Sequence, residues 1–377
     1  MIDIVKTKTC GIKECKVTLT DNGGIKREFI LRAFRSGDED GIIQCVREEH
    51  GDTYFKRFFY DSKALCEKAA GDEYIFFVAA CHEETSDPKG IKDKIAGIEI
   101  LRIFDKNGDD YIEPASQIIR KAYRGMGLSG ALADYTFKVA KDLRPEALLS
   151  HVAMYHSHTQ RVCEKNGMEP VAFEIGSFLT KALKNSYHLQ DVSKYSAGTL
   201  CLPVEKRDAG NVYLPLELRD YCGMIYEALD VKFCLADSSP VFDEEELPER
   251  SVFEISYDND INRYVTINTL LCGKNLYDEV SKITEEHIRG DANPDSFVYL
   301  LILDIDTPAF PKRYEAFKSM GFFFGGLFPL CGTHERAFLY KVGDLELRME
   351  TYCVTDKFDK VREWIMKYYK ARTRGQI

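Results

Sequence analysis

A short glycine-rich segment is the part of the chain whose residue types best suit a ligand. It occupies residues 124–130 and reads Arg-Gly-Met-Gly-Leu-Ser-Gly. The glycines at 125, 127 and 130 remove side chains where a backbone has to approach a ligand closely. A helix that begins here would point its first N–H groups and the positive end of its dipole outward, which suits a diphosphate. Glycines also serve tight turns between a strand and a helix, so the segment alone leaves both interpretations open.

The elements that position this segment follow from the spacing of apolar residues. Leu128, Leu132 and Tyr135 recur at helical spacing, which predicts a helix with one buried face directly after the turn. Ile118 and Ile119 predict a strand directly before it. The sequence therefore predicts a strand, a glycine-rich turn and a helix in immediate succession.

The rest of the first half alternates between strands and helices. Apolar and β-branched runs predict strands, and stretches of mixed polar and apolar residues predict helices. We expect strands at 27–34, 73–81, 94–104, 148–153 and 170–175, and helices at 38–50, 55–70 and 157–166. This order predicts an α+β (mixed α/β) domain.

The second half has a related build. A polar, turn-rich stretch at 184–211 is interpreted as a linker, and strands and helices alternate beyond it. A length of 377 residues suits two domains at roughly 100–200 residues each. We therefore expect two related domains around mostly antiparallel sheets, at residues 1–205 and 206–377.

The residues around the turn resemble a known signature. The segment from Tyr123 to Ser129 resembles the Gln/Arg-x-x-Gly-x-Gly/Ala motif of the GNAT superfamily of N-acetyltransferases, and only Ser129 departs from it. The resemblance covers roughly residues 25–205. It implies a GNAT fold, with a central twisted sheet flanked by helices, and acetyl-CoA as cosubstrate. The implied pyrophosphate cradle is Arg124, Gly125, Met126, Gly127, Leu128, Ser129 and Gly130.

The resemblance also implies residues for catalysis. Backbone N–H groups of Ile118 and Ile119 would hold the acetyl oxygen, where strand pairing splays open in this family. Glu99 is the carboxylate within the apolar run Ala-Gly-Ile-Glu-Ile-Leu, and bases in the family are often glutamates on neighbouring strands. We predict that Glu99 assists deprotonation of the acceptor, with a place on a solvent-facing side of the strand as the alternative.

Two positions depart from the family. His156 stands where the family has an Asn, and it would contact the pantetheine arm or be structural. Cys163 stands where the family often has a tyrosine general acid. Because buried thiols are usually packing residues, we expect Cys163 to have at most a minor acid role. The leaving thiolate would then be protonated mainly by water or leave unprotonated.

Part of the second half resembles the same family more weakly. Met320-Gly321-Phe322 is similar to the Gly-Phe pair and following strand of a GNAT domain, and residues 250–345 are interpreted as a degenerate second copy. Its one comparable turn has a single glycine, Gly273, which is too few for a cradle. This half is expected to complete the substrate cleft, to form a dimer contact or to sense a ligand.

Composition excludes several kinds of partner. The net charge is −10, and no stretch gathers Lys and Arg among aromatic residues, so we expect no nucleic acid partner. No run of about 18 apolar residues would span a membrane, and no export signal begins the chain, which predicts a cytoplasmic protein. The 12 cysteines are scattered singly, which favours reduced thiols, and no pattern of ligands predicts a metal.

These observations lead to one expected function and one alternative. We expect an N-acetyltransferase that moves an acetyl group from acetyl-CoA to an amine by direct attack. The acceptor would be a small-molecule amine or a peptide that the sequence does not identify. The alternative is a non-catalytic acyl-CoA-binding or regulatory module. A homodimer is compatible with either function.

Overall fold

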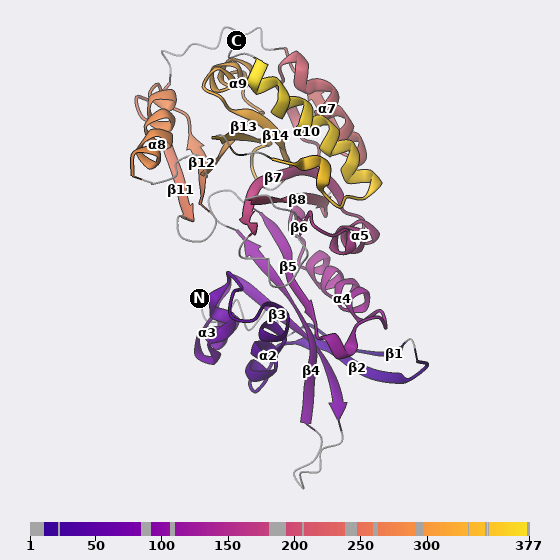
Figure 1. Cartoon of the computed structure of the whole chain (residues 1–377). Coiled ribbons are helices and arrows are strands. Elements are labelled where there is room, and N and C mark those ends of the chain that lie inside the picture. The colour runs from indigo at the N-terminus through magenta and orange to yellow at the C-terminus, as the bar shows by residue number, and fades with distance from the viewer. Residues whose placement is uncertain are drawn as a thin grey trace. The chain divides into compact units, whose positions relative to one another are not determined.

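The structure is a computed structural model of the whole chain, shown in Figure 1. It divides into two compact units, between Ser150 and His151. The described residues are 11–21, 23–83, 92–105, 110–180, 194–205, 207–237, 247–258, 263–290, 297–330, 332–343, 345 and 347–374. No helix in these ranges is long and apolar enough to cross a membrane.

The first unit is built on a sheet whose strands follow one another in chain order. All neighbours are antiparallel except the last pair, which is parallel because a helix connects its strands. The strands are β1 (Cys15–Thr20), β2 (Lys26–Ala33), β3 (Tyr74–Glu83), β4 (Lys92–Phe104), β5 (Tyr111–Ile119) and β6 (Ala147–Ala153), of which β6 runs into the second unit. The helices are α2 (Glu39–His50), α3 (Ser62–Ala70) and α4 (Leu128–Asp142), with short 3-10 turns at Arg57–Tyr60 and Lys121–Tyr123.

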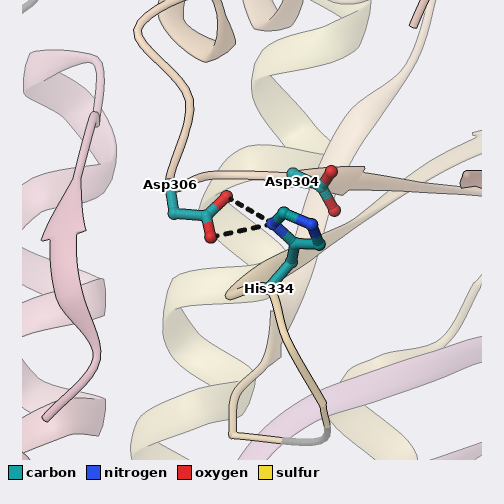
Figure 2. Close-up of side chains that lie close together, drawn as sticks. All are labelled: Asp304, Asp306 and His334. Carbon is teal, nitrogen blue, oxygen red and sulfur yellow. Dashed lines mark hydrogen bonds and ion pairs between the residues drawn. The ribbon is translucent and has the colours of Figure 1, made fainter. Parts of the chain in front are cut away.

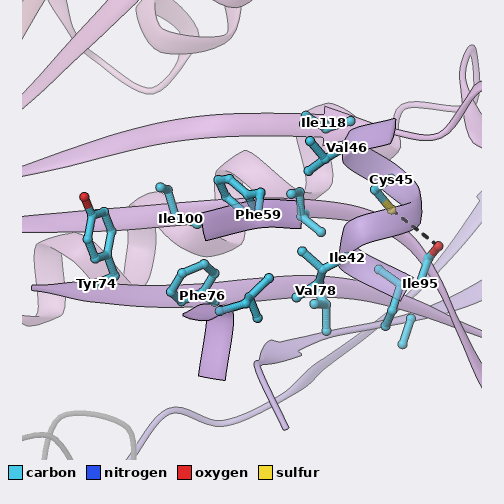
Figure 3. Close-up of a cluster of buried hydrophobic side chains, with 13 residues drawn as sticks. Ile42, Cys45, Val46, Phe59, Tyr74, Phe76, Val78, Ile95, Ile100 and Ile118 are labelled. Carbon is cyan, nitrogen blue, oxygen red and sulfur yellow. Dashed lines mark hydrogen bonds between the residues drawn. The ribbon is translucent and has the colours of Figure 1, made fainter. Parts of the chain in front are cut away.

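Both faces of this sheet are covered. On one side, here called the α2 face, Ile42 and Val46 of α2 pack with Phe76 and Val78 of β3 in a buried apolar cluster (Figure 3). On the other side, the α4 face, Phe77 meets Tyr135 of α4 edge to face, with ring centroids 5.7 Å apart. Alternate residues of β3 therefore point into two different layers, as the period of a strand requires.

The second unit contains a mixed sheet in the order β8-β7-β14-β15-β13-β12-β11. The pairing of β12 with β13 is parallel, and the others with a determined register are antiparallel. Its strands are β7 (Glu169–Leu179), β8 (Lys194–Pro203), β11 (Val252–Asp258), β12 (Tyr264–Leu271), β13 (Val298–Asp304), β14 (Phe323–Phe328) and β15 (Arg336–Val342), and β9 (Gly210–Val212) pairs separately with β10 (Phe233–Leu235). Its helices are α5 (His158–Lys165), α7 (Leu216–Ala228), α8 (Leu276–Gly290), α9 (Phe310–Ser319) and α10 (Asp356–Arg374), with a 3-10 turn at Met349–Thr351.

A glycine allows β14 to join β7 in this sheet. Gly326 is opposite Ala172, and a Cβ on Gly326 would lie 2.3 Å from the Ala172 side chain. Such a distance excludes any side chain, so the close approach of the two backbones requires glycine.

The same succession of elements occurs twice. In the second unit, β11 and β12 are antiparallel, α8 connects β12 to its parallel neighbour β13, and α9 leads to the antiparallel pair β14 and β15. In the first half, β4 and β5 are antiparallel, α4 connects β5 to parallel β6, and α5 leads to the antiparallel pair β7 and β8. We call these the first and second repeats. They agree with two related mixed α/β parts, as expected from the sequence.

The division of the chain differs from the expected one. The predicted boundary at residue 205 lies inside the second unit. The linker expected at 184–211 is wrong for residues 194–203, which form β8, while 181–193 lie outside the described residues. Small and polar residues such as Ser196 and Thr199 made this stretch look like a loop, yet both are fully buried in the sheet. Strand pairing satisfies their backbone groups, so composition alone was misleading.

Candidate functional site

A β-bulge in the first unit sets the geometry of the candidate site. Ile98 of β4 is opposite Ile118 of β5, and Ile100 is opposite Ala115. Two residues of β5, at positions 116 and 117, therefore face the single residue between them on β4, which is Glu99. The bulge residue Ser116 has a φ of 54°, in the left-handed region. The bulge places the side chains of Ser116 and Gln117 on different faces of the sheet, as the contacts of each show.

The glycine-rich turn follows this bulged strand and opens α4. Gly125 and Gly127 have φ values of 80° and 86°, in the left-handed region that favours glycine. Gly127 is the N-cap residue of α4, and the amide of Ala131 donates to the Gly127 carbonyl at 3.1 Å. As in any α-helix, the earlier amides of the first turn have no acceptor within the helix itself and are directed toward the helix start. The turn therefore has the backbone form that anion binding at a helix start requires.

The other cradle residues anchor the turn. Met126 and Leu128 are buried, so their side chains hold the turn against the core. The Arg124 guanidinium donates from Nε to the Ile119 carbonyl at 2.8 Å and pairs with Glu49. In this structure the guanidinium therefore braces the end of the strand, and its role in a cradle stays a prediction.

Ile118 and Ile119 lie at the end of β5, directly after the bulge, with buried side chains. Gly97 is opposite Ile119, and a Cβ on Gly97 would lie 2.4 Å from the Ile119 side chain. The glycine on β4 thus makes room for Ile119. The structure confirms that these two residues end a strand directly before the glycine-rich turn, and their role toward an acetyl oxygen stays a prediction.

Glu99 is buried on the α4 face and does not lie on a solvent-facing side of β4. Glu99 is only 4% exposed. Its Oε2 accepts hydrogen bonds from Thr136 Oγ1 at 2.8 Å and from Gln117 Nε2 at 3.1 Å. Burial raises the pKa of Glu99 to about 7, although the hydrogen bonds from Thr136 and Gln117 lower it. The solvent-facing alternative is therefore wrong, and the carboxylate belongs to an internal network beneath α4.

The same network reaches the cradle. Gln117 Nε2 also donates to the Ser129 carbonyl at 3.1 Å, and Ser129 Oγ donates to Gln117 Oε1 at 2.5 Å. Ser129 is the cradle position that departs from the family motif, and its hydroxyl could have been directed toward a ligand. In this structure its proton is directed to Gln117, because the bulge brings that amide beside the first turn of α4.

A second set of polar groups lies on the α2 face of the bulge. Tyr54 OH donates to Ser116 Oγ at 2.8 Å, and Lys56 Nζ donates to the same oxygen at 3.2 Å. Burial lowers the pKa of Lys56, and the charge of Glu113 on β5 partly offsets this effect. Burial raises the pKa of Tyr54, because its charged form is the anion, and the charge of Glu113 raises it further. We call the side chains of Tyr54, Lys56, Glu113 and Ser116 the Glu113 cluster. They are electrostatically coupled in a partly desolvated environment.

Sequence analysis did not find the Glu113 cluster. Tyr54 and Lys56 lie between α2 and α3, at the start of the stretch predicted as a helix over 55–70, and their partners are about 60 residues away. Pro114 within β5 was an available signal, since proline in a strand often accompanies a bulge.

His156 and Cys163 lie in the second unit, so the first unit alone does not contain them. His156 is on the turn before α5, and its carbonyl accepts from Gln160 Nε2 at 3.0 Å. Cys163 is on α5 and only 3% exposed, and its carbonyl accepts from the Met168 amide at 3.1 Å. This burial agrees with a packing role for Cys163. The predicted pantetheine contact of His156 stays a prediction.

The second unit holds three side chains that could approach a metal together. Ligand atoms of Asp304, Asp306 and His334 lie within 4.8 Å of one another, and no other such group of His, Cys and acidic residues was found among the described residues (Figure 2). His334 Nδ1 is 3.0 Å from Asp306 Oδ2, and this hydrogen bond accounts for the closeness of these two side chains. The sequence did not predict this group, and the expectation of a metal-independent protein stays a prediction.

Known proteins offer only distant likenesses. No protein-family model matches the chain, and no curated protein matches it. Several solved GNAT acetyltransferase structures are similar to it. The ribosomal-protein-S18-alanine N-acetyltransferase from Escherichia coli is 14% identical, over 47% of this chain and 94% of that chain, with a TM-score of 0.34. An N-acetyltransferase from Staphylococcus aureus Mu50 is 13% identical, over 47% and 99%, with a TM-score of 0.35.

A third structure is the GNAT domain of PAT from S. lividans, which is 14% identical over 50% of this chain and 96% of that domain, with a TM-score of 0.34. Each likeness spans nearly the whole of the smaller protein and about half of this chain.

Proposed function

We propose that the protein is an N-acyltransferase that transfers an acetyl group from acetyl-CoA to an amine. The observation that carries this proposal is the junction of β5 and α4. A bulged strand ends in a turn with two left-handed glycines, and the turn opens a helix whose first amides point outward. A diphosphate bound there would receive several backbone N–H donors and the positive end of the helix dipole.

The bulge gives the acyl group a place beside the cradle. Where two residues of β5 face one of β4, the regular ladder is interrupted, and we place the acyl group at this interruption. An N–H group at Ile118 or Ile119 would stabilise the oxyanion that forms when an amine attacks the thioester carbonyl. The amide bond then forms as the C–S bond breaks, and CoA leaves as a thiolate.

The attacking amine has to lose a proton, and two carboxylates are candidates to receive it. Glu99, the base expected from the sequence, has its carboxylate beneath α4 with Thr136 and Gln117. Glu113 faces the other side of the sheet, where Tyr54, Lys56 and Ser116 gather at the bulge. We assign proton acceptance to Glu113, directly or through a water molecule. The cation of Lys56 favours the charged carboxylate that a base requires.

The leaving thiolate does not require a strong acid. A thiol with a pKa of about 8.5 is a weak acid that is already partly ionised near neutral pH, so its thiolate is a tolerable leaving group. The burial of Cys163 supports a packing role for that thiol. Water then protonates most of the CoA that leaves.

Titration calorimetry with acetyl-CoA and a screen for CoA release test the proposal together. We expect one binding site per chain in the micromolar range, and thiol release with at least one member of a panel of amines and amino-terminal peptides. Binding without release across the panel would support the non-catalytic module instead. Absence of acetyl-CoA binding would overturn the proposed function.

A further inference from the structure

We propose that Gln117 is a positioning residue that holds the first turn of α4 in the form a diphosphate needs, and that Glu99 fixes the orientation of the Gln117 amide. This inference rests on the proposed function, and it gives Glu99 a different role from the base expected from the sequence. It follows from the hydrogen bonds that connect β4, β5 and α4.

The Gln117 amide makes three hydrogen bonds, and two of them reach the same residue of α4. Oε1 accepts from Ser129 Oγ, while Nε2 donates to the Ser129 carbonyl and to Glu99 Oε2. A reversed amide would turn its oxygen toward the Ser129 carbonyl and the Glu99 carboxylate, which have no proton to offer when Glu99 is ionised. Glu99 and the Ser129 carbonyl therefore select one orientation of Gln117.

The network holds α4 at two points. Gln117 bonds to Ser129 in the first turn, and Glu99 accepts from Thr136, seven residues later. Residues seven apart lie on the same side of a helix, about two turns apart. Two bonds on one side restrict rotation of α4 about its own axis, and that rotation determines where the amides of Leu128, Ser129 and Gly130 point.

The bulge is the reason that Gln117 can do this. Its two residues serve opposite faces, since Ser116 bonds to Tyr54 on the α2 face while Gln117 reaches Ser129 on the α4 face. The backbone of the same bulge is assigned to the acyl group, so one irregularity in β5 aligns the acyl end and the phosphate end of the site.

A purely structural network would affect folding and leave ligand affinity unchanged, so both have to be measured. The test compares wild type with Gln117→Leu by calorimetry with acetyl-CoA at pH 7, and by KM and kcat once an amine is known. We expect Gln117→Leu to weaken binding and raise the KM for acetyl-CoA about tenfold, with kcat within about threefold, because the bonds orient a binding surface. Ser129→Ala, which removes one bond, should give a smaller loss and serves if Gln117→Leu does not fold.

Two further variants sharpen the test. Tyr135→Phe removes a bond from α4 to the Lys13 carbonyl, away from the network, and should leave acetyl-CoA affinity unchanged. Glu99→Gln can still accept from Thr136 and Gln117 through its amide oxygen, so it should retain most of the affinity, whereas Glu99→Leu should lose it.

The outcomes separate this inference from the proposed function. If wild type binds acetyl-CoA and a folded Gln117→Leu protein binds equally well, the positioning role is wrong. A fall in kcat with unchanged KM in Glu99→Gln would also overturn it and would restore Glu99 as the base. If wild type itself does not bind acetyl-CoA, the proposed function fails instead.

Discussion

The two repeats have the same junction between a strand and a helix, and they use its backbone differently. In the first repeat, a Cβ on Gly127 would meet no atom within 4 Å. In the second repeat, between β12 and α8, a Cβ on Gly273 would lie 2.4 Å from the Arg250 carbonyl carbon. The Gly273 amide donates to Ser251 Oγ and the Lys274 amide to the Pro248 carbonyl, both at 2.9 Å.

In the second repeat, the backbone before β11 therefore fills the space beside the glycine. The corresponding space beside Gly127 in the first repeat is open. Gly273 allows the close approach of the segment before β11, whereas no described atom would lie near a Cβ on Gly127. The comparison teaches that a glycine before a helix is ambiguous until its surroundings are known. It also predicts that only the first repeat binds acyl-CoA.

The largest expected effect comes from replacing each of these two glycines with valine in separate variants. Gly127→Val should weaken acetyl-CoA binding by at least about 100-fold, on the order of 3 kcal/mol, because valine avoids a φ of 86° and the turn has to change its backbone. Gly273→Val should lower the melting temperature, while the affinity of the folded protein stays unchanged. Calorimetry and thermal unfolding of both variants measure this, and unchanged affinity in folded Gly127→Val would place the cradle elsewhere.

The next largest effect concerns the base. Glu113→Gln should lower kcat by about 10²–10⁴, because an amide cannot accept the amine proton. Glu254→Gln, an exposed glutamate on β11 of the second repeat, is the matched control and should retain full turnover. Turnover is measured from pH 6 to 9 once an acceptor is known. Full activity of Glu113→Gln over this range would exclude Glu113 as the base.

Stability should depend on pH through Glu99. Its ordinary pKa of 4.5 is raised to about 7 in the folded protein, so the folded state binds more protons between these values. The free energy of unfolding should therefore fall by roughly 3 kcal/mol as the pH rises from 4.5 to 7, and this contribution should be constant above that range. Urea unfolding at several pH values should show a flatter profile for Glu99→Gln, and an identical profile would contradict the shift.

A smaller effect is expected for Cys163. Cys163→Ala should lower turnover less than tenfold, because the thiol packs in the interior and the CoA thiolate leaves without it. Cys222→Ala, at a buried thiol on α7, controls for lost packing. Both variants are compared by thermal unfolding, acetyl-CoA affinity and turnover against pH. A loss of tenfold or more in Cys163→Ala at unchanged affinity, restored by Cys163→Tyr, would make this residue the acid.

No effect on turnover is expected from metal removal. The Asp304, Asp306 and His334 group lies in the second repeat, whereas the proposed chemistry uses the first. Dialysis against a chelator and the His334→Gln variant should both leave the rate of acetyl transfer unchanged. A rate that falls on chelation and recovers with added Zn²⁺ or Mn²⁺ would show that the second repeat takes part in the reaction.

The sequence by itself determined the local features of this protein. The spacing of Leu128, Leu132 and Tyr135 predicted α4, and the glycines at 125 and 127 predicted its turn, because both depend on nearest neighbours along the chain. Apolar runs likewise predicted β3 and β4. The buried polar strand β8 of the first repeat was missed, since pairing with distant residues and not composition makes it a strand.

Only the tertiary structure decided which groups of the site meet. Whether Glu99 faced solvent or α4 depended on the pairing register of β4 and on the bulge, and a shift of one residue would have reversed it. The Glu113 cluster joins residues about 60 positions apart, and the Gln117 network joins three elements. Such contacts arise from packing between distant segments, for which periodicity and motifs carry no information. The open junction of the first repeat and the filled one of the second differ for the same reason.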